Sequence, residues 1–257
     1  GTSNIKSTEN EFAGLSEGVY EYKVMDENGC SWTSDPIKVK NPDPIKISFN
    51  VSHVTIYDAS NGIINLAITG GTPGALGYKI EWLRGTSVVT DPADPAYNAD
   101  QDILSNIKAG LYKVLVTDEN ACAAVAEVEV TQPEIIKADI EVTHVRCNGS
   151  STGIINVKST EGGLGRYTYE LLDSNGIVVG SAAVVGSLAA GDYTLNIKDD
   201  AGAILSRPIE VQQPDAIKIE TVAELSKLSV DCFGNATGAV KVNISGGVPD
   251  YTYKWIG

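Results

Sequence analysis

One cluster of acidic residues could bind a metal ion. Asp91, Asp94, Asp100 and Asp102 lie in a segment rich in aspartate and proline. Clustered carboxylates on a loop are ligands that calcium prefers, since this ion takes about six to eight oxygens. No calcium-loop spacing is present, and Asp-Pro pairs are common in ordinary turns. The four aspartates are therefore candidate calcium ligands, and a solvated loop is the competing interpretation.

Aromatic residues recur with a spacing that could build a stacking surface for a carbohydrate. The residues concerned are Tyr78, Trp82, Tyr167, Tyr169, Tyr251, Tyr253 and Trp255. Residues two apart on a strand share one face, so Tyr251, Tyr253 and Trp255 would point the same way. A tryptophan on this strand usually fills the core of a β-sandwich, and we predict core positions for Trp82 and Trp255. Trp32 does not recur in the other copies of the repeat described below, which leaves it as the aromatic candidate for ligand contact.

No set of residues has the pattern of a catalytic site. There is no nucleophile elbow, no metal-binding histidine pair and no phosphate loop. The glycine-rich segment 162–165 precedes a strand-like stretch rather than a helix. His53 and His144 occupy equivalent positions in a repeat, which favours a structural role, since one histidine per repeat makes no metal site. We therefore expect a protein that is not an enzyme and needs no cofactor.

The composition indicates a folded β protein with many turns. The chain has 257 residues, of which 42% are hydrophobic, with 26 glycines and a single methionine,. Its net charge of −14 argues against nucleic acid or an anionic membrane as a partner,. No apolar run reaches about 18 residues, so we expect no membrane span. Short alternating stretches that end at Gly, Asn or Asp are typical of the strands of a sandwich.

One segment occurs three times and organises the chain. It begins at Leu15, Ile107 and Leu188, and each copy runs through a glycine and a tyrosine into a strand that ends at an aspartate. This pattern predicts the tyrosine corner of an immunoglobulin-like sandwich, in which the hydroxyl bonds back to the backbone. The residues of the corners are Gly18, Tyr20, Gly110, Tyr112, Gly191 and Tyr193. The aspartates expected to cap the following turns are Asp26, Asp118 and Asp199,.

The repeat divides the chain into modules that each open after a proline. These prolines are Pro42, Pro133 and Pro214, at intervals of roughly 80–90 residues,. The predicted divisions are 1–41, the C-terminal half of a module; 42–132 and 133–213, two complete modules; and 214–257, the N-terminal half of a module. Short junctions that contain proline are stiff. We therefore expect an all-β tandem array of sandwiches that forms an elongated rod, in which neighbouring modules contact each other.

Two half-motifs resemble a known family. Residues 232–240 followed by 246–255 look like the first half of an SprB repeat, and residues 15–20 followed by 26–30 look like its second half. SprB repeats are strung along giant cell-surface adhesins of gliding Bacteroidota. The resemblance implies a filamentous adhesin that is exported by type IX secretion and takes part in gliding motility.

The four cysteines lie in two kinds of turn. Cys147 and Cys232 belong to the turn after the first strand of a module, whereas Cys30 and Cys122 belong to its last turn. These turns lie at opposite ends of a sandwich. A disulfide within one module would need Cα atoms within about 7 Å, so it is not expected.

The positions that lack a cysteine distinguish the remaining pairings. Ile56 stands at the first cysteine position of residues 42–132, and Ala203 stands at the second position of residues 133–213. A bond from the first turn of one module to the last turn of the next explains both losses as one missing disulfide. It would also join all four cysteines to segments outside this chain. The alternatives are a bond between Cys122 and Cys147, or free buried thiols.

Two functions remain for the chain. The leading one is a non-enzymatic repeat stalk of an adhesin at the cell surface or outside the cell, with an unknown surface ligand. The alternative is a β-sandwich that binds glycan or protein directly. The half-modules 1–41 and 214–257 are complementary parts of one fold, so we also expect head-to-tail association between copies of the chain.

Overall fold

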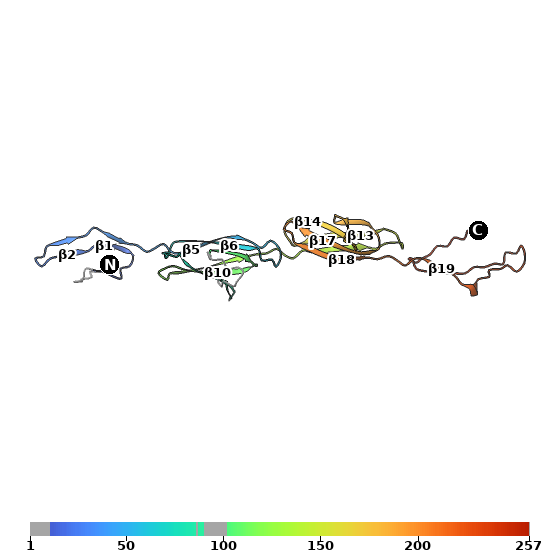
Figure 1. Ribbon diagram of the computed structural model, residues 1–257, viewed down its shortest axis with the longest axis horizontal. Coiled ribbons are helices and arrows are strands. Elements are labelled where there is room, and N and C mark those ends of the chain that lie inside the picture. Colours follow the sequence, from blue (N-terminus) through green and yellow to red (C-terminus); the bar gives the residue numbers. More distant parts are fainter. Residues whose placement is uncertain (1–10, 86, 90–101, 257) are drawn as a thin grey trace. The chain divides into compact units, whose positions relative to one another are not determined.

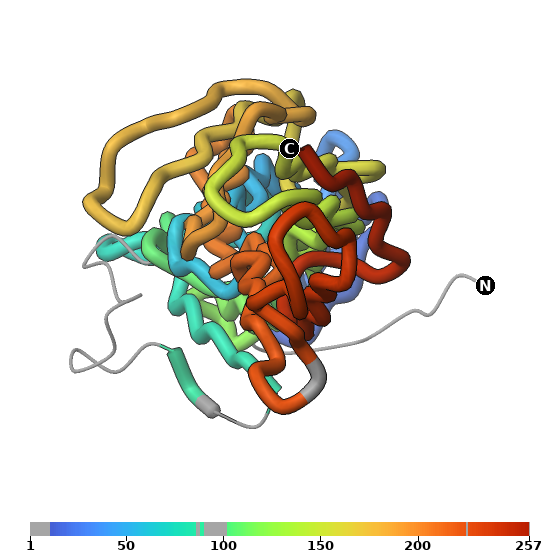
Figure 2. The backbone as a smooth tube through the Cα atoms, turned by 90° about the vertical axis from the view of Figure 1, so that its right-hand side faces the viewer, coloured from blue at the N-terminus to red at the C-terminus, as the bar shows by residue number. Residues whose placement is uncertain are grey.

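A computed structural model describes residues 11–85, 87–89 and 102–256 (Figure 1). Figure 2 traces the same backbone, with all other residues in grey. The described residues form antiparallel strands, and their one helical element is the short 3-10 helix η1 (Ala223–Leu225). None of their helices is long and apolar enough to cross a membrane. The predicted all-β class is confirmed.

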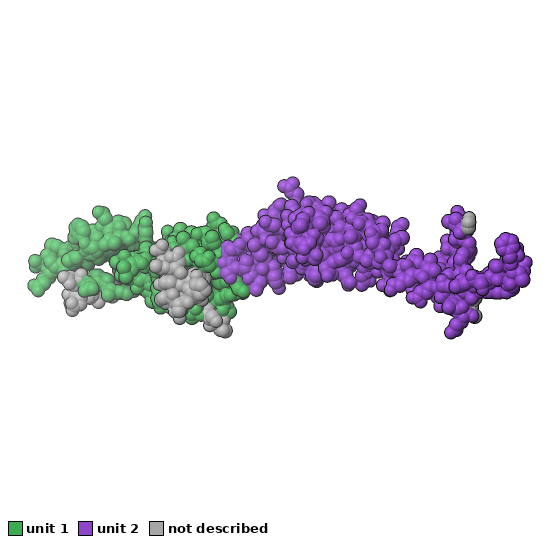
Figure 3. All heavy atoms as spheres, turned by 45° about the vertical axis from the view of Figure 1, so that its right-hand side comes forward, with its two compact units in different colours: residues 1–52, 62–130 green, residues 53–61, 131–257 purple. Residues whose placement is uncertain are grey.

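The chain divides into two compact units, which are described separately (Figure 3). Unit 1 comprises residues 1–52 and 62–130, and unit 2 comprises residues 53–61 and 131–257. The elongated rod and the module boundaries stay predictions. For brevity, residues 42–132 and 133–213 are called the first and second complete modules, and residues 1–41 and 214–257 the N- and C-terminal half-modules.

The strands of the first complete module form a pair of antiparallel sheets. One sheet has the order β5-β6-β9, with β5 (Lys46–Ser52), β6 (Gly62–Thr69) and β9 (Ile103–Ile107). The other has the order β11-β10-β7-β8, with β7 (Lys79–Arg84), β8 (Ser87–Val88), β10 (Gly110–Thr117) and β11 (Ala123–Val130). This division of strands is that of an immunoglobulin-like sandwich.

The second complete module repeats this topology within unit 2. One sheet has the order β12-β13-β16, with β12 (Lys137–Thr143), β13 (Gly153–Glu161) and β16 (Val184–Leu188). The other has the order β15-β14-β17-β18, with β14 (Tyr167–Asp173), β15 (Val178–Gly180), β17 (Gly191–Asp199) and β18 (Ile204–Val211). The predicted immunoglobulin-like fold is therefore confirmed.

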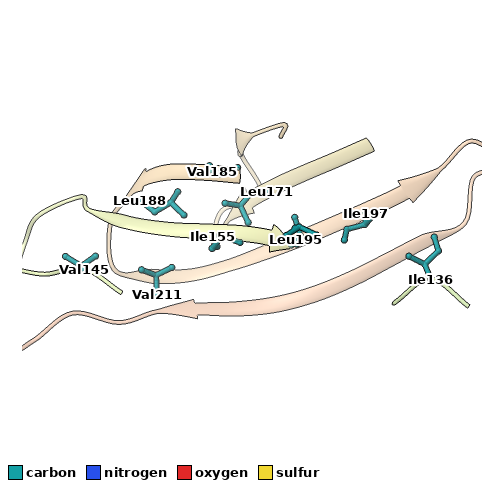
Figure 4. Packing of buried hydrophobic residues seen from close by; sticks show 10 residues of the cluster. Ile136, Val145, Ile155, Leu171, Val185, Leu188, Leu195, Ile197 and Val211 are labelled. Carbon is teal, nitrogen blue, oxygen red and sulfur yellow. The ribbon is translucent and has the colours of Figure 1, made fainter. Parts of the chain in front are cut away.

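The core of the second complete module lies between its two sheets. Alternation along β13 and β17 turns every second side chain inward, and Ile155, Leu195 and Ile197 are at most 1% exposed,. Leu171 on β14 packs among them, as Figure 4 shows. Apolar burial of this kind is the main stabilising term of the sandwich.

The half-modules contain smaller sheets. In the N-terminal half-module β1 (Gly18–Tyr20) pairs with β4 (Ile37–Val39), and β2 (Lys23–Met25) pairs with β3 (Ser31–Thr33). In the C-terminal half-module β19 (Lys218–Thr221) pairs with β20 (Val242–Ser245). The prediction of a strand at residues 251–255 is wrong. Among the described residues, no neighbouring strand forms backbone hydrogen bonds with this segment.

Candidate functional site

Each junction between predicted modules in unit 2 is a short segment that contains a proline. The first junction comprises residues 131–136, between β11 and β12. The second junction comprises residues 212–217, between β18 and β19. Both segments lie within unit 2.

The start of the second junction is bonded to the turn that follows β12. The N–H of Gln212 donates to His144 Nδ1 (3.0 Å), and the carbonyl of Gln212 accepts from the N–H of Val145 (2.8 Å). The side chain of Gln213 also accepts from the N–H of Gly149 (2.8 Å). The turn thus holds two consecutive junction residues against the module they have just left.

The first junction has the same bonds at equivalent positions. The N–H of Thr131 donates to His53 Nδ1 (3.1 Å), and its carbonyl accepts from the N–H of Val54 (3.0 Å). The Gln132 side chain accepts from the N–H of Asp58 (2.9 Å). The repeated histidines are therefore acceptors for backbone N–H groups, which agrees with the structural role expected from their repetition.

The end of each junction is bonded to the module that follows. The carbonyl of Glu134 accepts from the N–H of Gly163 (2.8 Å), and the carbonyl of Asp215 accepts from the N–H of Gly247 (2.7 Å). Gly162 has a φ of +81°, and a Cβ there would overlap the carbonyl oxygen of Ile135,. Glycine lets the two backbones approach closely enough for the junction to be held.

A tyrosine fixes each of these glycine pairs. Tyr167 Oη donates to the carbonyl of Gly162, directly before the residue that holds the junction. The equivalent pairs are Tyr78 with Gly70 and Tyr251 with Gly246. The polar ends of tyrosines considered for carbohydrate stacking are thus hydrogen-bonded to the backbone.

The aspartates at the end of the long repeated strand join two loops. Asp199 is 4% exposed, and its Oδ1 accepts from the N–H of Ala203 (2.8 Å) in the following turn. Its Oδ2 accepts from the N–H of Leu164 (2.8 Å), beside the glycine pair. Asp118 bonds in the same way to Cys122 and Thr72. The carboxylates cap the turn, as predicted, and also link it to the loop that holds the junction.

The buried carboxylate of Asp118 makes the stability of the first complete module depend on pH. The N–H of Thr72, and then those of Cys122 and Asn120, lower the pKa of Asp118 below its ordinary value of 3.8, although burial opposes them,. The ionised Asp118 carboxylate therefore stabilises the folded module at pH values above its ordinary pKa. This stabilisation is lost as the pH falls through the lowered pKa of the folded state.

We expect Asp118→Asn to be less stable than wild type at about pH 7, with a difference that shrinks at about pH 3. Asparagine cannot accept at both side-chain atoms, so one of the backbone donors loses its bond. Urea unfolding monitored by hydrogen exchange of residues 42–132 measures this difference. Glu129→Gln, at an exposed carboxylate of the same module, is the control. A difference that did not change with pH would contradict the assignment.

The corner tyrosines bond back to the chain four residues earlier. Tyr112 Oη donates to the carbonyl of Lys108 (2.8 Å), and Arg84 lies over its ring at 5.8 Å from the centroid. The other two corners are Tyr20 with Ser16 (2.8 Å) and Tyr193 with Ala189 (3.0 Å). Two of the corner glycines, Gly110 and Gly191, have backbone φ angles of +152° and +154°, which favour glycine. The third, Gly18, lies against the Tyr20 ring.

All four cysteines are free and exposed in the structure. Exposure does not fit the alternative of buried thiols. The turn of Cys147 lies at the second junction, because Asn148 Nδ2 donates to the carbonyl of Pro214 (3.0 Å). Cys30 and Cys122 follow the strand-ending aspartates. Cys232 lies in the turn between the bridged residues Lys227 and Ala239 of the C-terminal half-module. A disulfide between modules stays a prediction.

The tryptophans differ in their burial. Trp82 on β7 is fully buried and contacts the Phe49 ring at 6.1 Å between centroids. Trp255, predicted to lie in a core, is 68% exposed. That prediction is wrong, because among the described residues no further strand joins the β19–β20 sheet to cover this segment. Trp32 is 60% exposed and lies 5.8 Å from the Tyr22 ring.

Most of the candidate calcium ligands fall outside the described residues. These are Asp91, Asp94 and Asp100. Asp102 is exposed, and its carbonyl accepts from the N–H of Leu66 (2.7 Å). In the part of the chain that the structure describes, no three His, Cys, Asp or Glu side chains are grouped so that they could hold a metal ion.

An open groove of about 570 Å³ lies over β14, β17 and β18 in the second complete module. Thr194 and Asn196 line it from the face of β17 opposite to the core residues, with Pro208 on β18,. Asn196 Oδ1 accepts from Ser206 Oγ (2.7 Å) across the two strands. The groove mixes amide, hydroxyl and apolar groups with the carboxylates of Asp173, Asp192 and Glu210.

Two segments of the chain match the model of a known family. Residues 140–176 and 228–257 match the SprB repeat. Within these two segments the chain is similar to the SprB repeat. Each matched SprB segment includes the turn that holds a cysteine, the glycine pair and the tyrosine that fixes it. SprB repeats belong to cell-surface adhesins, so the chain is a repeat region of the adhesin type.

The solved structures that match the chain include two proteins with several domains in tandem. Three domains of the bacteriophage RB49 outer capsid protein Hoc share 12% identity over 80% of this chain and 70% of theirs, with a TM-score of 0.42. The N-terminal eight Ig domains of Down syndrome cell adhesion molecule share 12% identity over 77% of this chain and 28% of theirs, with a TM-score of 0.40. No curated protein matches the chain.

Sequence reasoning missed the junction bonds of Gln132 and Gln213. Both glutamines directly precede the module-opening proline, and this repetition in Gln132-Pro133 and Gln213-Pro214 was the available signal. The acceptor role of the two histidine rings could not be found in the same way, because it depends on where the last strand of each module, β11 or β18, ends.

Proposed function

We propose that the chain is a non-enzymatic stalk segment of a filamentous cell-surface adhesin that serves gliding motility and surface attachment. In this role the modules are spacers, and their stiffness transmits force from the cell to an adhesive site elsewhere. The proposal places the chain outside the cell, after type IX secretion. The similarity to SprB repeats supports the assignment to an adhesin. The hydrogen bonds of the junctions support the role of a stalk.

The observation that carries the proposal is that both junctions in unit 2 are bonded at each end. In the second junction, residues 212–214 are bonded to the preceding turn and Asp215 is bonded to the following glycine pair. Pro214 fixes its own φ between the two sets of bonds. Few backbone dihedrals are left free to act as a hinge, which is what a spacer under load requires.

Loosening the second junction should make the chain bend there. We expect the double variant His144→Ala, Gln213→Ala to lose two hydrogen bonds, worth about 1–3 kcal/mol together, and to acquire a hinge. Small-angle scattering of dilute protein should then show a shorter maximum dimension and a broader distribution of distances than wild type. The sandwiches should keep their circular dichroism.

The control is Gln212→Ala, since that side chain bonds Glu210 on β18 rather than the turn. Its scattering curve should match that of wild type. Wild-type protein that already scatters as a hinged particle would contradict the stalk.

The groove over β14, β17 and β18 favours a second candidate function, direct binding of a glycan or protein. Its exposed polar groups face outward, so a ligand could reach them without disturbing the core. A glycan array probed with wild type and with Thr194→Arg, which would fill the groove, tests this function. Binding that is lost in the variant would make the module a receptor rather than a spacer.

A further inference from the structure

Two histidine rings hold the starts of the junctions, and each ring does so as a hydrogen-bond acceptor. His53 Nδ1 accepts from the N–H of Thr131 (3.1 Å), and His144 Nδ1 accepts from the N–H of Gln212 (3.0 Å). A ring nitrogen accepts a hydrogen bond only while it carries no proton. Each ring is therefore neutral, with its proton on Nε2, and the start of each junction is held by that form of the ring.

The turn that carries each histidine also forms without one. In the second complete module, the N–H of Arg146 donates to Thr152 Oγ1 (3.0 Å). In the C-terminal half-module Ser229 stands at the position of the histidine, and the N–H of Asp231 still donates to Thr237 Oγ1 (3.0 Å). The turn therefore does not require an imidazole for its own shape. What the imidazole adds is the bond to the junction.

We propose that both junctions are sensitive to pH: the neutral imidazole holds the first residue of the junction, and the protonated imidazole releases it. Protonation turns Nδ1 from an acceptor into a donor, so that two N–H groups would face each other. His53 and His144 are both exposed, so the charged ring can turn away into water. Histidine ordinarily gains this proton between about pH 8 and pH 5, so the bond is present above this range and lost below it.

Each histidine lies at an end of its module that also carries two carboxylates and one cation. For His144 these groups are Asp192 on β17, Glu210 opposite it on β18, and Arg146 in the turn. For His53 they are Glu129 on β11, Lys108 before β10, and Asp58 in the turn. Glu210 also accepts from the Gln212 side chain (3.3 Å), which places it beside the residue that the ring holds. A protonated ring that leaves the junction thus stays in acidic surroundings, which accommodate its charge.

The other bonds at the start of the second junction involve no group that titrates in this range. They are the bond from the N–H of Val145 to the Gln212 carbonyl, that from the N–H of Gly149 to the Gln213 side chain, and that from Asn148 to the Pro214 carbonyl. Protonation therefore removes one bond and leaves the others, so the junction loosens while the sandwich stays folded. This inference concerns the bonds of the junctions and does not rest on the role of a stalk.

Hydrogen exchange of single amides, followed by NMR at about pH 7 and pH 5, tests the proposal. Carboxylates ordinarily stay ionised at both values, so a change between them reports the histidines. The protection of the Gln212 and Thr131 amides, relative to the exchange rate of an unstructured chain at the same pH, should fall on the order of 10-fold at the lower pH. The amide of Gly163 is the control within the same sample, because its acceptor is the backbone carbonyl of Glu134.

Two substitutions of His144 separate the effect of the proton from that of the side chain. His144→Asn places an amide oxygen where Nδ1 lies, and this oxygen does not titrate, so Gln212 should stay protected at both pH values. His144→Ala has no acceptor, so Gln212 should lack this protection at both. His53 is intact in either variant, so Thr131 should keep its response to pH and serves as the matched control.

Wild-type protein in which Gln212 is equally protected at the two pH values overturns the proposal. So does a pH response of Gln212 that survives in His144→Ala, because the titrating group would then lie elsewhere. His144→Ala decides the question even if the shorter asparagine fails to reach the junction. The amide readout is also separate from scattering: a chain that is hinged at about pH 7 would contradict the stalk and leave the role of the histidines intact.

Discussion

Trp82→Ala is expected to lower the free energy of unfolding of the first complete module by about 3–5 kcal/mol. The Trp82 side chain is fully buried on β7, between the two sheets, and packs against Phe49. Neighbours on both sheets would have to move inward to fill the space, and β-sheets held by their hydrogen bonds can do so only in part. The variant therefore loses both the transfer free energy of the ring and the contacts across the cavity.

Hydrogen exchange with mass spectrometry measures the effect module by module. Protection of residues 42–132 should fall strongly, while that of residues 133–213 should stay at the wild-type level. Trp82→Leu should cost less, because leucine fills the equivalent position in the second complete module as Leu171.

Trp255→Ala is the matched control, since it removes the same side chain from an exposed position. In dilute protein it should change the stability of either sandwich by less than about 0.5 kcal/mol. Equal losses for Trp82→Ala and Trp255→Ala would contradict the burial of Trp82.

The sequence was sufficient to predict those parts of the fold that rest on local patterns. Alternation of apolar residues gave the strands, and the glycine and tyrosine before β10 and β17 indicated where the long strand of each sandwich begins. The aspartate at the end of that strand predicted a capped turn. These features depend on residues a few positions apart, so their chemistry is readable from spacing alone.

The contacts at the junctions depend instead on residues far apart in the chain. His144 and Gln212 meet only because β18 returns to the end of the sandwich where β12 finished. Trp255 shows the converse: its spacing on a strand matches a core position, but burial also requires a second sheet in the right place. Periodicity states which face of a strand is apolar and leaves open what covers that face.

Gly162→Ala should disturb the first junction more than any substitution of a junction side chain. Gly162 has a φ of +81°, in a region where an alanine costs about 1–2 kcal/mol,. A Cβ would also overlap the carbonyl of Ile135, a backbone atom that cannot rotate away. Relief requires the junction to separate from the loop, which breaks the bond from the N–H of Gly163 to Glu134. We expect a total loss of about 3 kcal/mol or more in the second complete module, and a new hinge at residues 131–136.

Gly176→Ala separates the two causes of this loss. Gly176 has a φ of +78° in the β14–β15 hairpin, and a Cβ there would meet no atom within 4 Å. This variant has the same backbone strain without the close approach, so it should lose only about 1–2 kcal/mol and leave the junction unbent. Chemical denaturation gives the free energies, and small-angle scattering of the same samples reports the hinge. If both variants lost the same stability and scattered alike, the contact between the glycine pair and the junction would have no mechanical role. A larger loss and a hinge in Gly162→Ala alone would tie the stiffness of the array to a backbone contact that only glycine permits.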